Sequence, residues 1–422
     1  MSISSKGFKP ILSFDQLKVN ESLLKPLKNF ENPTPIQSIT WPCLLKGKDT
    51  IGIAETGSGK TLSFALPGLE RHVLNDDDSS EVTILVIAPT RELAVQTYEN
   101  VHNLNIVNSI CLYGGVSKDD QKKTIKKLKP RVVVGTPGRL LDLVNDGGLN
   151  LGNVKYLVLD EADRMLDQGF EKDIRAIIGN TPKERQTAMF SATWPQSVRA
   201  LASTFMTDPV RVTVGSEELT ANKRVAQVIE VLDDQRQKDW KLNNHLKQIR
   251  KEKGDARVLI FALYKKEASR IENTLRRNGH GVGAIHGDLS QVQRMKALED
   301  FKFGKVPLLV ATDVAARGLD IPNVEVVINV TFPLTIEDYV HRIGRTGRGG
   351  KSGKSITFFT DNEKHLAGEL QKLLREGGYE IPEGLKKFPA VIKKKEHSAY
   401  GAFYKDIGGD EEAKKPKKIT FD

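Results

Sequence analysis

The stretch TIGIAETGSGKTLSFALPGLERHVL, residues 50–74, decides the fold class of this chain. Its first four residues form the kind of short β-branched run that makes a buried strand, its middle is rich in glycine, and its last part has the length of a helix. In such a unit, glycines let backbone N–H groups approach phosphate oxygens, and the helix N-terminus adds positive potential. The loop AETGSGKT, residues 54–61, is therefore predicted to bind nucleotide phosphates.

The residues of this loop have distinct predicted roles. Lys60 is expected to reach the β- and γ-phosphates, and the Thr61 hydroxyl is expected to bind Mg²⁺. Ala54 stands where the usual pattern has glycine, and the alternative interpretation is a glycine-rich turn that opens a structural helix. The remaining candidate phosphate-binding residues are Thr56, Gly57, Ser58 and Gly59.

Short apolar runs recur through the first half of the chain, with helix-length segments such as RELAVQTYENVHNL (91–104) between them. Runs of this length suit strands that are buried on both faces, which is typical of parallel sheets. Their alternation with helices predicts a doubly wound α/β domain. The runs are residues 49–54, 82–88, 109–114, 131–136, 154–160 and 187–193.

The same alternation returns in the second half, after a polar stretch without clear periodicity. It predicts a second α/β domain of similar build that lacks a phosphate loop of its own. The strand-like runs are residues 228–232, 256–262, 281–287, 306–312, 324–330 and 354–360. The predicted organisation is a first domain at 1–213, a linker at 214–227, a second domain at 228–375 and a basic tail at 376–422 that is expected to be disordered.

Composition restricts the partners of the chain. Its 422 residues include 64 Lys and Arg against 54 Asp and Glu, which gives a net charge of +10. This balance favours an acidic partner such as nucleic acid, although a basic tail on an ordinary enzyme would give the same sum. Two cysteines without a CxxC pair argue against a disulfide framework and a zinc site. No secretory signal or membrane span is evident, so we expect an intracellular, soluble protein.

A second acidic motif complements the phosphate loop. The segment VKYLVLDEAD, residues 154–163, reads as a strand that ends in carboxylates. Asp160 is a candidate for the Mg²⁺ shell, and Glu161 is a candidate general base for the attacking water. Taken alone, acidic residues after a strand are more often a helix cap or a solvated turn. Together with the phosphate loop they predict a site that hydrolyses nucleotide.

With these motifs in view, the chain resembles the DEAD-box ATP-dependent RNA helicases of superfamily two over about residues 14–365. The tetrapeptide DEAD is present at 160–163, and further family motifs follow in order. The resemblance implies two tandem RecA-like domains that close around ATP and RNA, with Mg²⁺ at the phosphates. The further motifs are NFENPTPIQ (29–37), PTRELA (89–94), GG (114–115), TPGRL (136–140), SAT (191–193), HGDLSQVQR (286–294), ATDVAARGLD (311–320) and HRIGRTGR (341–348).

The resemblance also implies nucleotide-binding residues outside the loop. Gln37 would read the adenine edge, Phe14 would stack on the base, and Asp320 would contact the ribose. Phe14 is equally well explained as a core residue. The second domain has no phosphate loop, so Arg345 and Arg348 make sense as arginine fingers that face the nucleotide of the first domain. The alternative is a basic patch that touches RNA alone.

The remaining motif residues are assigned by resemblance to RNA contact or to coupling. RNA contacts are expected just past strand ends, where open α/β sheets bind ligands. The expected RNA-binding residues are Pro89, Thr90, Arg91, Gly115, Thr136, Gly138, Arg139, Gly287 and Thr312, with Arg294 lining or supporting the track. The residues expected to couple hydrolysis to RNA release are Asp163, Ser191, Thr193 and His341.

Two rival functions stay open, and the resemblance also suggests a cellular role. One rival is a related DNA helicase or translocase, and the other is an RNA clamp that assembles particles without unwinding. The segment FPAVIKKKEHSAYGAFYKD, residues 388–406, is similar to fungal members that process pre-ribosomal RNA. The resemblance therefore implies a monomer in the nucleus and nucleolus that acts on pre-ribosomal particles.

Overall fold

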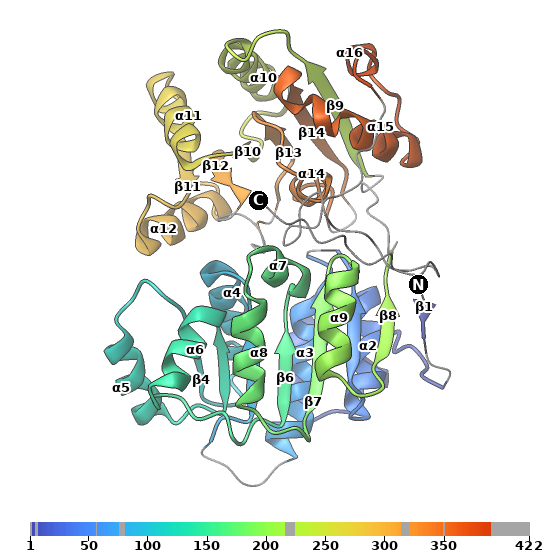
Figure 1. Cartoon of the computed structure of the whole chain (residues 1–422), viewed down its shortest axis with the longest axis vertical. Coiled ribbons are helices and arrows are strands. Elements are labelled where there is room, and N and C mark those ends of the chain that lie inside the picture. Colours follow the sequence, from blue (N-terminus) through green and yellow to red (C-terminus); the bar gives the residue numbers. More distant parts are fainter. Residues whose placement is uncertain are drawn as a thin grey trace, which may run out of the picture.

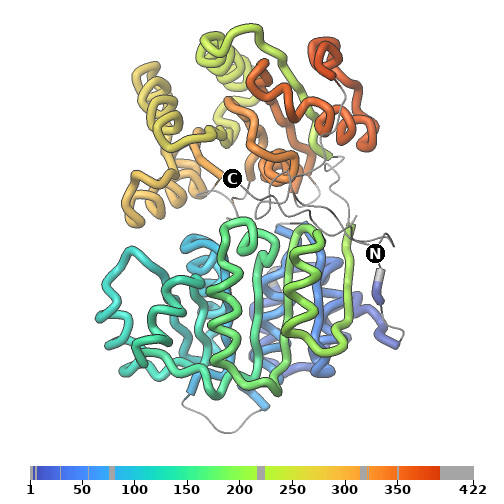
Figure 2. Tube along the Cα trace, in the orientation of Figure 1, coloured from blue at the N-terminus to red at the C-terminus, as the bar shows by residue number. Residues whose placement is uncertain are grey.

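The computed structural model describes residues 2–4, 7–55, 57–75, 81–215, 224–313, 321, 323–348 and 351–389. The chain forms two lobes, stacked one above the other in Figure 1, and each lobe is built around its own sheet. The tube in Figure 2 shows that the first lobe holds the first half of the chain, from blue to green, and the second lobe the other half, from yellow-green to red. The predicted pair of α/β domains is thus confirmed as a fold class.

The first lobe contains an eight-stranded sheet in the order β1-β8-β2-β7-β6-β3-β5-β4. All neighbouring strands pair in parallel except β1, which is antiparallel to β8. The strands are β1 (Ser2–Ile3), β2 (Thr50–Ile53), β3 (Ile84–Ile87), β4 (Ser109–Leu112), β5 (Val132–Gly135), β6 (Tyr156–Leu159), β7 (Gln186–Ser191) and β8 (Val210–Thr213).

Helices cover both faces of this sheet. Side chains of successive residues in β3, such as Leu85 and Val86, fall into two different core clusters, one on each face. This burial on both sides explains why the strands read as continuous apolar runs. The helices are α1 (Glu21–Leu24), α2 (Pro35–Leu45), α3 (Lys60–Leu69), α4 (Arg91–His102), α5 (Lys118–Leu128), α6 (Pro137–Asn145), α7 (Ala162–Asp167), α8 (Glu171–Gly179) and α9 (Gln196–Phe205), with shorter turns η1 (Phe14–Gln16), η2 (Lys25–Asn29) and η3 (Glu70–Leu74).

The second lobe contains a six-stranded sheet in the order β11-β12-β10-β13-β14-β9, with every pair parallel. Its strands are β9 (Val225–Val231), β10 (Val258–Ala262), β11 (Val282–Ile285), β12 (Leu308–Thr312), β13 (Val326–Asn329) and β14 (Gly353–Phe359). Its helices are α10 (Gln237–Lys253), α11 (Lys265–Arg277), α12 (Gln291–Lys302), α14 (Ile336–Ile343), η4 (Asp361–Leu366), α15 (Ala367–Glu376) and α16 (Glu383–Lys386).

The second domain is larger at both ends than the sequence predicted. Strand β9 begins at Val225, inside the predicted linker, because its early residues pair with β14. At the other end, the segment after residue 376 packs on the lobe through Leu385 and through Phe388, whose ring centroid lies 5.5 Å from that of Phe359. The apolar residues of this segment are spaced too irregularly to give a periodic signal. Residues 216–223 and 390–422 lie outside the described residues.

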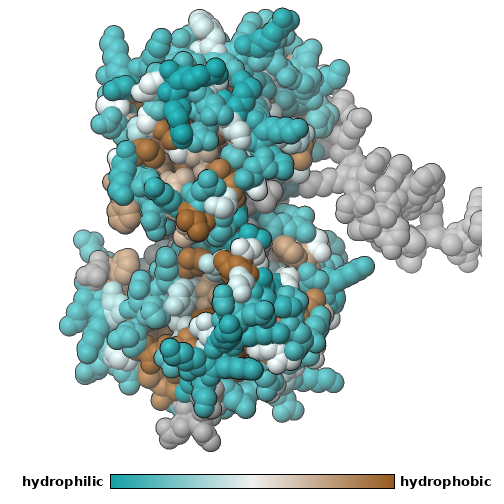
Figure 3. All heavy atoms as spheres, turned by 90° about the vertical axis from the view of Figure 1, so that its left-hand side faces the viewer, coloured by the Kyte–Doolittle hydropathy of each residue, from teal (hydrophilic) through white to brown (hydrophobic). Residues whose placement is uncertain are grey.

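Among the described residues, no helix is both long enough and apolar enough to cross a membrane. The face of the molecule in Figure 3 is largely hydrophilic, with brown apolar patches near the boundary between the lobes and others within each lobe.

Candidate functional site

The phosphate loop lies between β2 and α3, as predicted. Gly57 and Gly59 have φ angles of 78° and 93°, which are left-handed conformations that glycine adopts without strain. Lys60 is buried at the start of α3, and its Nζ donates a hydrogen bond of 2.9 Å to the carbonyl of Ala54. Thr61 follows it in the first turn of the same helix. Thr56 lies outside the described residues.

Gln37 braces this loop from α2. Its Oε1 accepts a hydrogen bond of 2.9 Å from the backbone N–H of Thr34, which completes a capping box at the start of α2. Its Nε2 donates to the carbonyl of Gly59 at 3.1 Å. The T-x-x-Q pattern signals the cap in the sequence, but it does not reveal the bond to the loop. Phe14 is half-buried, with its ring centroid 6.2 Å from that of Trp41, so the structure places it against the core beside α2.

The acidic motif begins where β6 ends. Asp160 is 3% exposed, and its Oδ1 has no hydrogen-bond partner. Burial and the charge of Glu161 raise the pKa of Asp160 to about 7, against the opposing effect of Lys60. A buried carboxylate oxygen without a partner fits a divalent cation, and Thr61 offers a second oxygen. Within the described ranges, no group of three or more His, Cys, Asp or Glu is placed to hold a metal ion.

Glu161 occupies a conformation that non-glycine residues rarely adopt. Its φ and ψ are 51° and 56°, and it forms the N-cap of α7. A non-glycine residue in this region costs of order 1–3 kcal/mol, and such strain gathers at functional sites. Glu161 is buried, and it is the next residue in the sequence after Asp160, whose Oδ1 has no hydrogen-bond partner.

Asp163 joins the predicted coupling residues into one network. Its Oδ2 accepts hydrogen bonds from the backbone N–H and the hydroxyl of Thr193, at 3.0 and 2.8 Å. Its own N–H donates to the hydroxyl of Ser191 at 3.3 Å. Burial disfavours the charged form of Asp163, but the charges of His341 and Lys60 and the hydrogen bonds that the carboxylate accepts together outweigh it and hold the pKa of this carboxyl below its ordinary value. His341 belongs to the second lobe, so its charge acts on Asp163 across the boundary between the lobes.

One arginine of the second lobe, Arg348, lies against the phosphate loop of the first. A β-carbon placed on Gly57 would come within 3.0 Å of Nη1 of Arg348. The Nε of Arg348 donates a hydrogen bond of 2.7 Å to the carbonyl of Gly344, which holds the Nε side of the guanidinium group in place. Arg345 is 3% exposed in the same segment. Arg342 instead holds the second lobe together, since it pairs with Asp313 and donates to the carbonyl of Thr331 at 2.7 Å.

The order of strands sorts the motifs of the first lobe into two groups. The phosphate loop, SAT and DEAD follow the adjacent strands β2, β7 and β6, whereas PTRELA, TPGRL and GG follow the adjacent strands β3, β5 and β4. Because the strands are parallel, both groups lie at the carboxyl edge of the sheet. The DEAD segment stands at the boundary between them.

The predicted RNA-binding residues of the first lobe gather at two helix N-termini. Pro89 precedes Thr90, the N-cap of α4, whose hydroxyl accepts a hydrogen bond from the N–H of Leu93. Thr136 is the N-cap of α6, and Gly138 has open space beside it in the first turn. The guanidinium of Arg91 lies against Gly115.

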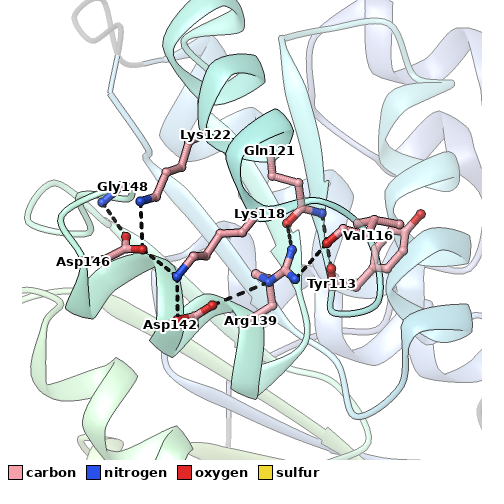
Figure 4. A network of polar contacts seen from close by, with 9 residues as sticks. All are labelled: Tyr113, Val116, Lys118, Gln121, Lys122, Arg139, Asp142, Asp146 and Gly148. Carbon is pink, nitrogen blue, oxygen red and sulfur yellow. Dashed lines mark hydrogen bonds and ion pairs between the residues drawn. The ribbon is translucent and has the colours of Figure 1, made fainter.

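Arg139 is directed into the protein. Its Nη1 donates to Oε1 of Gln121 at 2.6 Å and its Nη2 to the carbonyl of Val116 at 3.0 Å, while Nε lies 3.9 Å from Asp142 (Figure 4). Lys118 joins the same network through Asp142. Arg139 therefore positions the loop after β4, and sequence reasoning missed Gln121 because nothing in the local pattern marks it.

Two of the predicted RNA-binding residues lie in the second lobe. Gly287 follows strand β11, and Thr312 is the last residue of the adjacent strand β12. Two further contacts join the lobes beside them. Nη1 of Arg294 lies 2.7 Å from Oε1 of Glu92, and both side chains are largely buried. Nη2 of Arg164 donates to the carbonyl of Asp313 at 3.5 Å. Asp320 lies outside the described residues.

Known protein families and chains resemble this chain over most of its length. The DEAD/DEAH box helicase family model matches residues 34–201, and the helicase conserved C-terminal domain model matches residues 238–350. ATP-dependent RNA helicase DBP3 of Candida albicans is 57% identical over 425 residues, covering 99% of this chain and 74% of the relative. The relative of the same name from Saccharomyces cerevisiae is 56% identical over 422 residues, covering 99% and 79%.

Solved structures of similar chains hold nucleotide and RNA. Mss116p, bound to single-stranded RNA and AMP-PNP, matches with a TM-score of 0.79 and 29% identity, covering 90% of this chain and 82% of that one. Dbp5 of Saccharomyces cerevisiae, bound to RNA and ADP BeF3, matches with a TM-score of 0.77 and 30% identity, covering 87% and 94%.

Proposed function

Because the chain belongs to the DEAD-box family of ATP-dependent RNA helicases, we propose that it binds ATP and one RNA strand at the junction of its lobes and uses hydrolysis to separate short duplexes or remodel RNA–protein complexes. The observation that supports this most directly is Arg348 of the second lobe against Gly57 of the phosphate loop. A catalytic site that draws groups from both lobes is complete only when the lobes are closed.

The first lobe supplies binding and water activation. Lys60 exchanges its bond to the carbonyl of Ala54 for the β- and γ-phosphates. Thr61 and Asp160 would hold Mg²⁺, which when bound neutralises charge on the phosphates. Glu161, held in place as the N-cap of α7, orients the attacking water and accepts its proton. Arg345 and Arg348 stabilise the charge that develops as the γ-phosphate leaves.

RNA binding and closure are linked in this proposal. The N-termini of α4 and α6 face backbone phosphates, with Gly287 and Thr312 continuing the track on the second lobe. Two electrostatic interactions form when the lobes meet, the ion pair of Arg294 with Glu92 and the effect of the His341 charge on Asp163. ATP and RNA each bind the closed state better, so each favours the other.

The finer role that we propose is action on pre-ribosomal RNA in the nucleolus, by a monomer. The family resemblance of the segment 388–406 and the identity to fungal relatives over nearly the whole chain support this choice. Crosslinking of RNA to the protein in cells, followed by sequencing, is expected to recover pre-ribosomal transcripts. Recovery of messenger RNA in their place would overturn the assignment.

The two-lobe mechanism is tested with Arg345→Ala and Arg348→Ala in the full chain. Each variant is expected to lose RNA-stimulated turnover by ~10³-fold or more, with little change in ATP affinity, because the fingers engage only on closure. Arg277→Ala, at an exposed arginine of the second lobe, is the matched control. Parental turnover of the finger variants at saturating RNA would show that these arginines touch RNA alone. If the unmutated protein does not hydrolyse ATP in a single-turnover experiment, it acts as a clamp that does not unwind RNA.

A further inference from the structure

A cavity lies in the second lobe, away from the nucleotide and RNA residues. It has a volume of about 200 Å³ and is lined by the last turns of α10 and by residues at the amino ends of β10, β11 and β12. Its floor is apolar and formed by Leu246, Ile249, Val258 and Leu308, all of them buried. Small-molecule sites usually reach ~300–1,000 Å³, so this cavity suits one bulky side chain better than a nucleotide.

Two exposed cations of α10 stand beside the cavity. Arg250 lines it, and Lys247 lies one turn earlier on the same helix. Within the part of the chain that the structure describes, neither cation has an ion-pair partner. Asp255 also lines the cavity and is its acidic member. His280 is another lining residue, and burial together with the charges of Arg250 and Lys247 lowers its pKa.

The same helix carries an exposed tryptophan. Trp240 is 64% exposed on α10, with Nζ of Lys241 at 5.8 Å from its ring centroid. It precedes Lys247 by two turns, so the two residues share the outward side of the helix. A rise of ~1.5 Å per residue puts Trp240 about 15 Å from Arg250 along the axis, a distance that a short peptide spans. Helix α10 lies in the part of the second lobe that faces away from the first (Figure 1).

We propose that Trp240, the cationic residues Lys247 and Arg250, and the cavity together form a docking surface for an acidic peptide segment of a partner protein that carries one bulky apolar side chain. The apolar side chain fills the cavity, flanking carboxylates face Lys247 and Arg250, and the peptide packs on Trp240. Tryptophan and arginine are the residues that most often dominate such interfaces. The apolar floor favours a peptide over RNA, since phosphates would leave it unfilled.

The test uses the full chain as bait for a displayed library of short random peptides, with Arg250→Glu as the subtraction bait. Enriched peptides are expected to share an aromatic or large aliphatic residue flanked by Asp and Glu. A fluorescently labelled peptide from this set should bind Trp240→Ala and Arg250→Glu at least about tenfold more weakly than the parent. The peptide with its apolar residue replaced by alanine should lose affinity to a similar extent.

Lys364→Glu is the matched control, because Lys364 is an exposed cation in η4, beyond the carboxyl end of β14 and so at the opposite edge of the sheet. It should bind the peptide like the parent, and RNA-stimulated ATPase should be unchanged in all three variants, which separates this surface from the catalytic proposal. Absence of an acidic consensus, or equal affinity for Arg250→Glu, would overturn the proposal. Displacement of the peptide by an RNA hairpin, with weaker hairpin binding by Arg250→Glu, would assign the surface to RNA instead.

Discussion

Asp160 and Glu161 are neighbours in sequence that each reduce the stability of the fold in a different way. Asp160 keeps a buried carboxylate oxygen without a partner, and Glu161 adopts a left-handed backbone conformation. A chain selected for stability alone would relieve both, so their persistence is physically explained by a ligand that uses them. The sequence predicted the roles of these side chains from the motif, but it could not predict the strain at Glu161.

The role of Glu161 is tested with Glu161→Gln, which keeps the size of the side chain and removes the basic oxygen. ATP binding should persist and turnover should fall by ~10²–10⁴-fold. The measurement is steady-state and single-turnover ATPase at saturating RNA, with Glu171→Gln on the exposed start of α8 as a control. Turnover of Glu161→Gln at the parental rate would remove the general base from the mechanism.

The pKa of Asp160 predicts how stability changes with pH in the absence of nucleotide and Mg²⁺. Because the pKa is about 7 in the folded chain and ~4 in an unfolded one, stability falls as the pH rises through this window. Asp160→Asn removes that dependence and should be more stable than the parent at pH 8, by up to ~4 kcal/mol, but not at pH 4. Urea unfolding at both pH values measures the difference, and saturating Mg-ATP should cancel the advantage. An equal difference at both pH values would contradict the assignment.

The strands and helices that carry the motifs were predictable wherever burial alone decided them. The apolar runs from β2 to β7 marked strands covered on both faces, and the glycine-rich loop marked the turn into α3. Strand β8 and the start of β9 escaped prediction because they depend on pairing with distant strands. The brace from Gln37 to Gly59 and the bond from Arg139 to Gln121 escaped for the same reason, since each joins elements that only the fold brings together.

Gln37 gives a way to separate the stability of α2 from nucleotide recognition. Gln37→Glu keeps an oxygen that can accept from the N–H of Thr34 but loses the donor to the carbonyl of Gly59. It should retain most of the unfolding free energy and lose ATP affinity. Gln37→Ala should lose both, with ~1 kcal/mol of stability and a narrower gap between ATP and GTP binding.

Chemical unfolding and calorimetric titration with ATP and GTP measure these two effects. An ATP-to-GTP preference that stays at the parental value in both variants would limit Gln37 to a structural role.

The candidate site contains residues of both lobes, so it cannot be predicted from either half of the sequence alone. Arg348 lies against Gly57 although about 290 residues separate them in the chain, and the motif order predicted this meeting only through the lack of a second phosphate loop. The pair of Glu92 and Arg294 was not predicted as a contact between lobes, because each residue sat in a separate RNA motif. Charge complementarity between distant segments leaves no local pattern.

Closure through this pair is tested by charge exchange. Glu92→Arg and Arg294→Glu should each weaken RNA binding in the presence of a non-hydrolysable ATP analogue, because each leaves like charges in contact. The double exchange should restore part of the loss, with a coupling energy of ~0.5–3 kcal/mol. The surface pair Glu171 and Arg175 in the first lobe, exchanged in the same way, should show no effect. Additive losses in the double variant would mean that the two residues act separately.

The division of the catalytic groups between the lobes has a consequence for how much ATP a cell consumes. ATP is abundant at all times, and an enzyme whose site were complete in one lobe would consume it without pause. Here Lys60 and Glu161 belong to the first lobe, whereas Arg345 and Arg348 belong to the second. On the proposed mechanism, ATP is hydrolysed only while RNA holds the two lobes together. The concentration of RNA, rather than that of ATP, therefore sets the rate of hydrolysis.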